Sequence, residues 1–192
     1  MEWFLGGRAY NHGMEIVPDT KDWTWVLQRP CPECGLDTRQ LRREDIPDMI
    51  RETAARLATE LARPDVRQRP APDVWSPLEY ACHVRDVFRL YDERLRRMLA
   101  EDDPLYPNWD QDTTAVAERY GEQDPAGVAA ELREAGQSLA GRFEQVTGDQ
   151  WQRTGTRSDG ARFTVETFAR YLIHDPIHHL YDVTGQPQGE GS

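Results

Sequence analysis

The chain has 192 residues, which is enough for one domain with its own core, and its mean hydropathy of −0.79 and short apolar runs predict neither a membrane span nor a signal peptide. The 23 basic and 34 acidic residues give a net charge of −11, and this acidic balance repels phosphate backbones and argues against nucleic-acid binding. We expect a cytoplasmic protein without membrane or nucleic-acid partners.

Residues 1–40 show no sustained periodicity and are predicted to form an irregular arm, rich in tryptophan and turn-forming residues. The arm contains the sequence C-P-E-C-G, in which Cys31 and Cys34 flank a turn. With Cys82 the chain has three cysteines. An odd number in a cytosolic protein argues against a disulfide framework and favours a metal-binding, redox or packing role.

Helical periodicity begins near residue 46. Apolar side chains recur every three or four residues over 46–62, and Pro64 then stops the helix. Arginine and proline dominate residues 63–73, which are therefore predicted to form a loop. The first long helix is thus bounded on its C-terminal side by a segment that cannot continue it.

A second long helix is predicted to begin directly after Ser76 and to run to about Ala100. Serine is a favoured N-cap, Pro77 occupies the first helical position, where proline is tolerated, and Glu79 completes a capping box. An acidic run ending in a proline follows Ala100 and limits the helix at its other end.

The remaining segments are a short helix, a third long helix, a turn or short hairpin and a last helix, in chain order 113–120, 124–148, 154–162 and 164–185. Four long helices with apolar faces pack most simply as an antiparallel-type bundle. The sequence therefore predicts an all-α fold with a four-helix bundle at 41–185, which follows the arm and precedes a flexible tail at 186–192.

Three of the five histidines lie within H-D-P-I-H-H on the last predicted helix. Residues four positions apart face the same side of a helix, so His174 and His178 can present both rings to one point. A catalytic zinc-type site needs three protein ligands and an open position, and His83 is the only histidine on another predicted core helix. We predict a metal site of these three residues inside the bundle. A solvated helix face and ordinary hydrogen-bonded histidines are the alternatives.

The neighbours of this pair have supporting roles in the prediction. His179 points about 100° away from the preceding histidine and is expected to be a supporting or surface group. Asp175, one turn earlier, can pair with it, and Asp182 can hold the second nitrogen of His178. Pro176 removes a backbone hydrogen bond inside the helix, so a kink or widened turn is expected there.

The segments W-S-P-L-E-Y-A-C-H-V-R-D and Y-L-I-H-D-P-I-H-H-L-Y-D-V resemble the two signature segments of the DinB-like (DinB/YfiT) superfamily, and the resemblance covers about residues 45–185. It implies a four-helix bundle, often dimeric, in which a histidine of the first segment and the H-x-x-x-H of the last helix bind a divalent metal such as zinc or nickel. In this chain those ligands are His83, His174 and His178. Pro176 and the arm with C-P-E-C-G depart from the family's usual pattern.

The C-P-E-C-G turn has the shape of a zinc knuckle, in which two thiolates hold one side of a tetrahedral metal. A second zinc at Cys31 and Cys34 needs two further ligands, which His12 or a second chain in a dimer would have to supply. A redox pair and a reduced structural turn are the other interpretations. Cys82 falls on the apolar side of its helix and is expected to pack in the core.

The resemblance extends to function, because the superfamily includes maleylpyruvate isomerases and mycothiol or bacillithiol S-transferases. It implies a metal-dependent thiol transferase or thiol-dependent isomerase that binds a small-molecule substrate and a low-molecular-weight thiol. Lys21 is the only lysine among the 23 basic residues, a bias typical of GC-rich genomes, and this favours mycothiol. The catalytic residues are left open, with Tyr171, Arg85 and Asp86 as candidates for lining the site.

Two other functions remain open from the sequence. In a metal-dependent hydrolase the same site would activate water, with Glu79 or Asp86 as the general base. In a non-catalytic protein the domain would bind a metal or a small ligand without turnover. Conjugation that requires a thiol distinguishes a thiol-dependent enzyme from a hydrolase. Metal content measured together with thiol titration distinguishes a non-catalytic binding protein from both.

Overall fold

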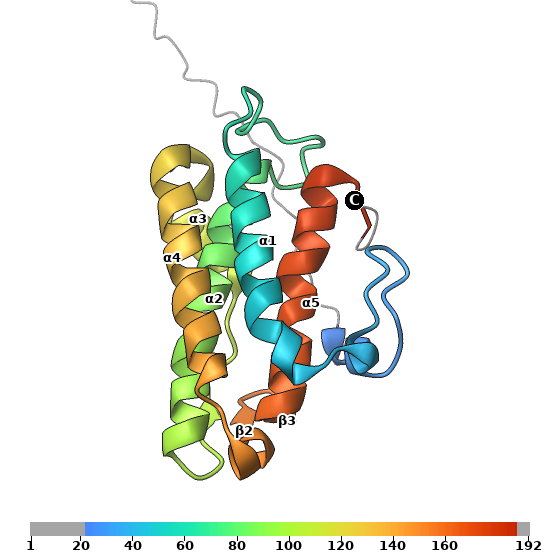
Figure 1. The fold of residues 1–192 in the computed structure, drawn as a ribbon. Helices are drawn as coiled ribbons and strands as arrows, with labels where there is room; N and C mark the ends of the chain where they lie inside the picture. Colours follow the sequence, from blue (N-terminus) through green and yellow to red (C-terminus); the bar gives the residue numbers. More distant parts are fainter. Residues whose placement is uncertain (1–21, 188–192) are drawn as a thin grey trace, which may run out of the picture.

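A computed structural model describes residues 22–187, and its framework is four long helices packed side by side (Figure 1). These are α1 (Ile46–Glu60), α2 (Pro77–Ala100), α4 (Pro125–Glu144) and α5 (Val165–Thr184), with a shorter helix α3 (Gln111–Ala117) between α2 and α4. The predicted all-α class with a four-helix bundle is confirmed. None of the helices in the described range is both long and apolar enough to span a membrane.

The helix ends follow from local sequence. The Ser76 hydroxyl accepts a hydrogen bond from the Glu79 backbone N–H at 3.3 Å, and the Glu79 carboxylate accepts one from the Ser76 N–H at 2.8 Å, which forms the predicted capping box of α2. Helix α5 begins after Thr164 in the same way and ends at Gly185, whose φ of 68° is left-handed. The helix continues through Pro176 without interruption.

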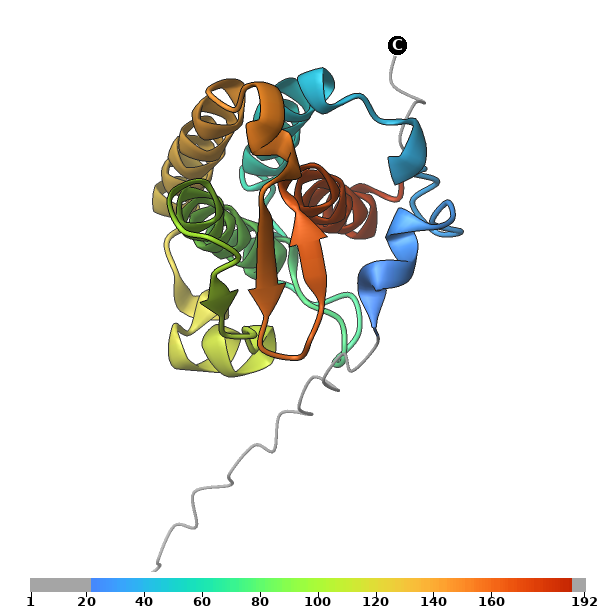
Figure 2. The ribbon, with the colours of Figure 1, turned by 90° about the horizontal axis from the view of Figure 1, so that it is seen from below.

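The helices pack in the cyclic order α1, α4, α2, α5. Helix α4 lies against both α1 and α2, while α5 lies against α1 and α2 on the opposite side. A glycine permits the close approach of α1 and α4, since a Cβ at Gly136 would lie 2.9 Å from the Cβ of Ala54. Figure 2 shows the bundle end-on, with α5 between the other helices and the arm.

A small sheet lies at one end of the bundle (Figure 2). Strands β2 (Thr154–Arg157) and β3 (Arg162–Thr164) form the predicted hairpin, which leads directly into α5. Strand β1 (Leu105–Tyr106) pairs in parallel with β2 and was not predicted, because two residues carry no detectable alternation. The sheet brings the segment after α2 next to the start of α5.

The described part of the arm lies along α5 and consists of short 3₁₀ turns joined by loops: η1 (Trp23–Leu27), η2 (Thr38–Gln40) and η3 (Arg43–Asp45). It contributes Cys31, Cys34 and Leu36 to the hydrophobic core, and Val26 of the arm is also buried. Two further 3₁₀ turns, η4 (Tyr120–Glu122) and η5 (Gly148–Gln152), precede and follow α4. His12 and the predicted tail beyond 187 lie outside the described residues.

Candidate metal centre

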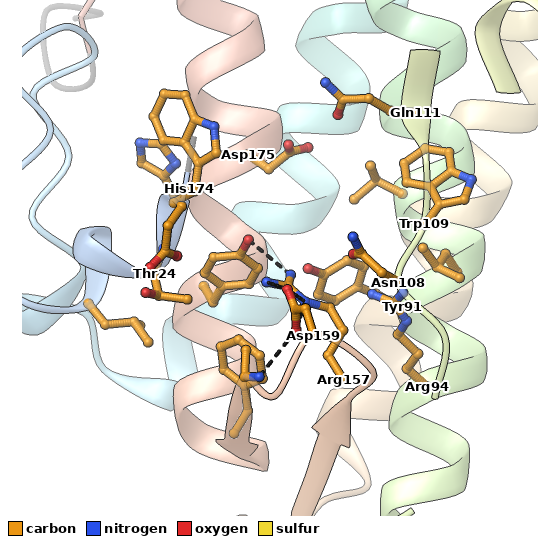
Figure 3. A pocket seen from close by; sticks show the side chains of 18 of the residues that line it. Thr24, Tyr91, Arg94, Asn108, Trp109, Gln111, Arg157, Asp159, His174 and Asp175 are labelled. Carbon is orange, nitrogen blue, oxygen red and sulfur yellow. Dashed lines mark hydrogen bonds and ion pairs between the residues drawn. The ribbon is translucent and has the colours of Figure 1, made fainter. Parts of the chain in front are cut away.

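A cavity of about 970 Å³ opens between α2 and α5, and the arm, the segment around Trp109 and the β2–β3 hairpin form its other walls. Figure 3 shows Tyr91 and Arg94 on the α2 side, with His174 beside the arm. Asp175 projects toward the open space in the same view. The five site-forming residues His83, His174, Asp175, His178 and His179 all line this cavity. They belong to two separate groups.

The first group joins α2 to α5 and consists of His83, Asp175 and His179, whose ligand atoms all lie within 4.8 Å of one another. The Nε2 atom of His83 lies 3.3 Å from Asp175 Oδ2, and the Nε2 atom of His179 lies 3.5 Å from Asp175 Oδ1. Asp175 and His179 are one turn apart, so their side chains share a face of α5. Two imidazoles and one carboxylate thus converge on one point of the cavity wall.

Neighbouring side chains fix the orientation of both rings. The His83 ring is stacked on Trp109, with ring centres 5.4 Å apart and planes at 14°, and it also contacts Trp75 at 5.2 Å. On α5, the Nδ1 atom of His179 lies 2.9 Å from Asp182 Oδ2. A carboxylate on one ring nitrogen leaves the other nitrogen free to bind a cation, as is typical of metal-binding histidines.

The charges of the first group favour a cation. Burial alone would lower the pKa of His179, but Asp175 and Asp182 raise it to about 10. Burial would likewise raise the pKa of Asp175, yet the facing His83 and His179 rings hold it well below its ordinary value. Asp175 is therefore a carboxylate at neutral pH. A pair of carboxylates at one imidazole stabilises positive charge there, which either a proton or a metal ion can provide.

The second group joins the arm to α5 and consists of Cys31, Cys34, His174 and His178, all of them buried, with ligand atoms within 4.8 Å of one another. The Cys31 sulfur lies 3.6 Å from His178 Nδ1. Burial lowers the pKa of His174 to about 4 and also lowers that of His178, so both imidazoles are neutral at pH 7. Burial raises the pKa of the Cys34 thiol to about 12.

The structure thus divides the predicted trio. Within residues 22–187, no group of three such ligand atoms joins His83 to His174 or His178. The physical reason is the rotation of α5: successive residues are about 100° apart, and the packing of the helix turns Asp175 and His179 toward α2 while the predicted pair faces the arm. His179, expected as a supporting or surface group that pairs with Asp175, does lie 3.5 Å from that carboxylate, and it also belongs to the group that contains His83.

Sequence reasoning missed Asp175 and His179 as partners of His83, although their own i, i+4 spacing carried the same signal as the H-x-x-x-H pair. Asp182 was expected beside His178, and it lies 3.9 Å from that ring but 2.9 Å from His179. No local pattern indicated Trp109, because it reaches His83 from a loop after α2.

The structure also locates the other residues singled out from the sequence. Tyr171 lines the cavity, whereas Arg85 and Asp86 lie outside its lining. Asp86 accepts hydrogen bonds from Arg85 at 2.8 Å and from the Tyr120 hydroxyl at 2.7 Å. Glu79 is held by the capping box and by Arg69, and Cys82 is fully buried in the core, as predicted.

The far wall of the cavity carries positive charge. Arg94 is 5% exposed, donates to the Pro107 carbonyl at 2.7 Å, and has a buried Nε with no hydrogen-bond partner. Its guanidinium lies over the rings of Tyr91 and Tyr106, at 5.5 and 4.8 Å. Arg157, in contrast, pairs with Asp159 at 2.8 Å. Among the described residues, Arg94 is thus a buried cation of the cavity without a carboxylate partner.

Fold and site together define a class of protein: a four-helix bundle in which side chains of metal-binding types converge from two of its helices. The model of the DinB superfamily matches residues 48–183, well over half of the chain. The chain therefore belongs to the DinB superfamily, and the resemblance seen in its two signature segments is confirmed.

A solved structure with the same fold is YfiT from Bacillus subtilis, described as a probable metal-dependent hydrolase with an unusual four-helix bundle topology. The two chains superpose with a TM-score of 0.68 at 20% sequence identity, and the match covers 74% of this chain and 84% of YfiT. At this identity the similarity shows the shared fold. No curated protein matches the chain.

Proposed function

We propose that this protein is a metal-dependent enzyme whose divalent cation is bound by His83, Asp175 and His179. The observation that carries the proposal is the convergence of these three ligand atoms at the wall of the large cavity between α2 and α5. Three protein ligands leave coordination positions open for a reactant, which is typical of catalytic rather than structural sites. Membership of the DinB superfamily supports the same interpretation.

The residues present fit such a cation. The Oδ2 atom of Asp175 is buried and accepts no hydrogen bond of good geometry, although it faces the His83 ring. Buried oxygens without a partner are rare and call for a ligand. A divalent cation bound there would lower the pKa of a nucleophile and so make it reactive at neutral pH. The chain's own contribution is to orient both imidazoles, through Trp109 and Asp182, and to limit access of water.

The substrate carries an anionic group that binds Arg94. A buried guanidinium without a carboxylate partner is costly, and its planar donors match a carboxylate or phosphate group. Arg94 and the ligands of the first group both line the cavity, from α2 and α5. An anionic substrate anchored at Arg94 would extend toward the cation. The cavity volume lies near the upper end of the range for small-molecule sites, which leaves room for a second reactant.

We favour thiol transfer or thiol-dependent isomerisation as the reaction, with a low-molecular-weight thiol such as mycothiol as the nucleophile. The two carboxylates considered as bases for hydrolysis are engaged elsewhere: Glu79 in the capping box and the ion pair with Arg69, and Asp86 with Arg85 and Tyr120. Neither lines the cavity. A thiol needs no separate general base once its pKa is lowered, so thiol transfer does not require either carboxylate to act as a base.

The test is a thiol-dependence assay on metal-loaded protein. Conjugation of a carboxylate-bearing electrophile is measured with and without mycothiol, in the wild type and in His83→Ala, Asp175→Asn and His179→Ala variants. We expect turnover only with thiol, and a loss of at least about 100-fold in each variant, since each removes a ligand.

Hydrolysis of esters or amides without added thiol would overturn thiol transfer and leave the metal centre in place. Retention of activity in all three variants would overturn the metal centre itself. A protein that binds metal through these residues but converts neither class of substrate would be a binding protein, and the proposal of an enzyme would then be wrong.

A further inference from the structure

A second set of four ligand side chains lies where the arm meets α5. Cys31 and Cys34 come from the C-P-E-C-G turn, and His174 and His178 come from successive turns of the helix. Their exposed fractions are 2%, 0%, 4% and 8%. All four ligand atoms lie within 4.8 Å of one another.

The distances suit a tetrahedral metal. Bonds of about 2.3 Å to sulfur and about 2.1 Å to nitrogen place a sulfur and a nitrogen ligand about 3.6 Å apart. The Cys31 sulfur lies 3.6 Å from His178 Nδ1. On the other nitrogen of the same ring, Glu33 Oε2 lies 3.5 Å from Nε2. A carboxylate at Nε2 is the arrangement that leaves Nδ1 free to face the sulfur.

One unpartnered polar atom at this place points independently to a ligand. The His174 Nε2 atom is buried and has no hydrogen-bond partner. Cys31 and Cys34 are free thiols, fully enclosed by protein. A buried imidazole nitrogen without a partner is destabilising, and a metal ion would satisfy it together with both sulfurs.

We propose that Cys31, Cys34, His174 and His178 bind one zinc ion as a closed structural site that joins the arm to α5. The two thiols bind as thiolates, so two protons are released to solvent as two zinc–sulfur bonds form, and the two imidazoles bind in their neutral form. Sulfur and nitrogen ligands with four-coordinate geometry select zinc over oxygen-preferring cations such as magnesium and calcium. The site is distinct from the open three-ligand group of His83, Asp175 and His179.

The turn has the backbone geometry of a knuckle. The Cys31 N–H donates to the Leu36 carbonyl at 2.9 Å, and the Gly35 N–H donates to the Cys31 carbonyl at 3.0 Å. Gly35 has a φ of 77°, which a side chain would strain. These bonds hold both sulfurs on one side of the turn, facing α5. A short arm with few core residues gains its attachment from the metal, as other small metal-stabilised segments do.

The site is tested on the full chain, purified under reducing conditions without chelator. Zinc per chain is measured by elemental analysis for the wild type, Cys31→Ser and Cys34→Ser, with Cys82→Ser as the matched control, since Cys82 is a buried thiol outside the group. We expect each of the first two variants to hold about one zinc fewer than the wild type, and the control to hold the wild-type amount.

Cobalt substitution of the wild type gives a readout that needs no variant to fold. Two thiolates should produce an intense sulfur-to-cobalt charge-transfer band in the near ultraviolet together with the visible bands of tetrahedral cobalt. His83→Ala and His179→Ala should keep this band while losing the metal of the first group, so failure of the proposed enzyme and failure of the zinc site are distinguishable.

Three results would overturn the site. The first is an unchanged zinc content in both arm variants. The second is cobalt-loaded wild type without the charge-transfer band. The third is a Cys31–Cys34 disulfide in protein freshly purified under reducing conditions, seen by mass spectrometry as the loss of two hydrogens, because it would assign the pair to redox chemistry instead.

Discussion

One carboxylate on α5 controls the geometry of the candidate metal centre. Asp182 lies 2.9 Å from His179 Nδ1 and holds the ring so that Nε2 faces Asp175. Asp182→Asn keeps the shape of the side chain but removes its charge. We expect the affinity of the first group for zinc to fall about 10- to 100-fold, as is usual when such a partner is lost. The measurement is a chelator-competition titration in a Cys34→Ser background, which isolates this group.

The control for this prediction is Glu33→Gln in the same background, since Glu33 is near His178 rather than His179. It should leave the zinc affinity of the first group unchanged. Equal losses in the two variants would mean that charge in the neighbourhood, and not the contact with His179, sets the affinity.

The proposed recognition of an anionic substrate also depends on one residue, Arg94. Arg94→Gln removes the buried charge that we assign to substrate binding, whereas Arg94→Lys keeps a positive charge without the planar donors. Losing a charge-assisted hydrogen bond costs about 2 kcal/mol, which corresponds to about a 30-fold rise in KM. We expect that rise for Arg94→Gln with kcat little changed, and an intermediate effect for Arg94→Lys.

Arg153→Gln is the matched control, because Arg153 also donates to backbone carbonyls, those of Met98 and Glu101, but does not line the cavity. Its KM should stay at the wild-type value. If Arg94→Gln lowered kcat and the melting temperature while KM stayed constant, the residue would have a structural role only, and the anionic substrate would lose its support.

At the scale of the elements, substitutions at two glycines of α4 can distinguish the effect of helix propensity on stability from the effect of helix packing. Gly141 has nothing within 4 Å of an added Cβ. Gly141→Ala should therefore stabilise the protein by about 0.5–1 kcal/mol, because alanine lowers the conformational entropy of the unfolded chain. A Cβ at Gly136 would lie 2.9 Å from Ala54 Cβ, which cannot move without moving α1. Gly136→Ala should therefore destabilise by about 1–3 kcal/mol.

Thermal unfolding measures both changes, and a shift of about 2–4 °C is expected for each kcal/mol in a chain of this size. The two variants should move the melting temperature in opposite directions. A rise for both would show that α1 withdraws from α4 at little cost, and that close contact between these helices is not required for stability.

The difference between local and long-range interactions explains which elements could be predicted from the sequence. The start of α2 at Ser76 and the end of α5 at Gly185 depend on hydrogen bonds within a few residues, so local residue types determine them. Strand β1 depends on a pairing with β2 about fifty residues later and has no local signal. Which face of α5 turns toward α2 is likewise decided by packing, and a shift of one residue exchanges Asp175 and His179 for His174 and His178.

At the scale of the whole molecule, α5 presents candidate ligand side chains on two faces, and the two groups differ in kind. The group facing α2 has three such side chains, all of which line the cavity, whereas the group facing the arm has four, of which only the two histidines line it. The sequence predicted the family, the bundle and the importance of the H-D-P-I-H-H segment. The contact between Cys31 and His178 could not be predicted, because these residues are 147 positions apart and their contact depends on the complete fold.

The arm also forms part of the cavity wall, since Asp22, Trp23, Thr24, Leu27 and Gln28 line it. A zinc ion that holds the arm on α5 would therefore help to enclose this cavity. Removing that zinc should release the arm while the bundle, whose core lies between the four long helices, stays folded. Arm attachment and bundle stability are thus expected to be separable in one measurement.

Hydrogen exchange followed by mass spectrometry makes that measurement, with peptides from residues 22–45 compared with peptides from α2 and α4. In Cys34→Ser we expect exchange in 22–45 to accelerate at least about tenfold, because the N–H groups of Cys31 and Gly35 lose the turn that protects them. Exchange in α2 and α4 should stay slow. His83→Ala, which removes a ligand of the other group, should leave the arm protected. If the arm exchanged at the same rate in wild type and Cys34→Ser, burial of apolar side chains such as Val26 and Leu36 would be sufficient to hold it, and the proposed zinc site would have no structural role.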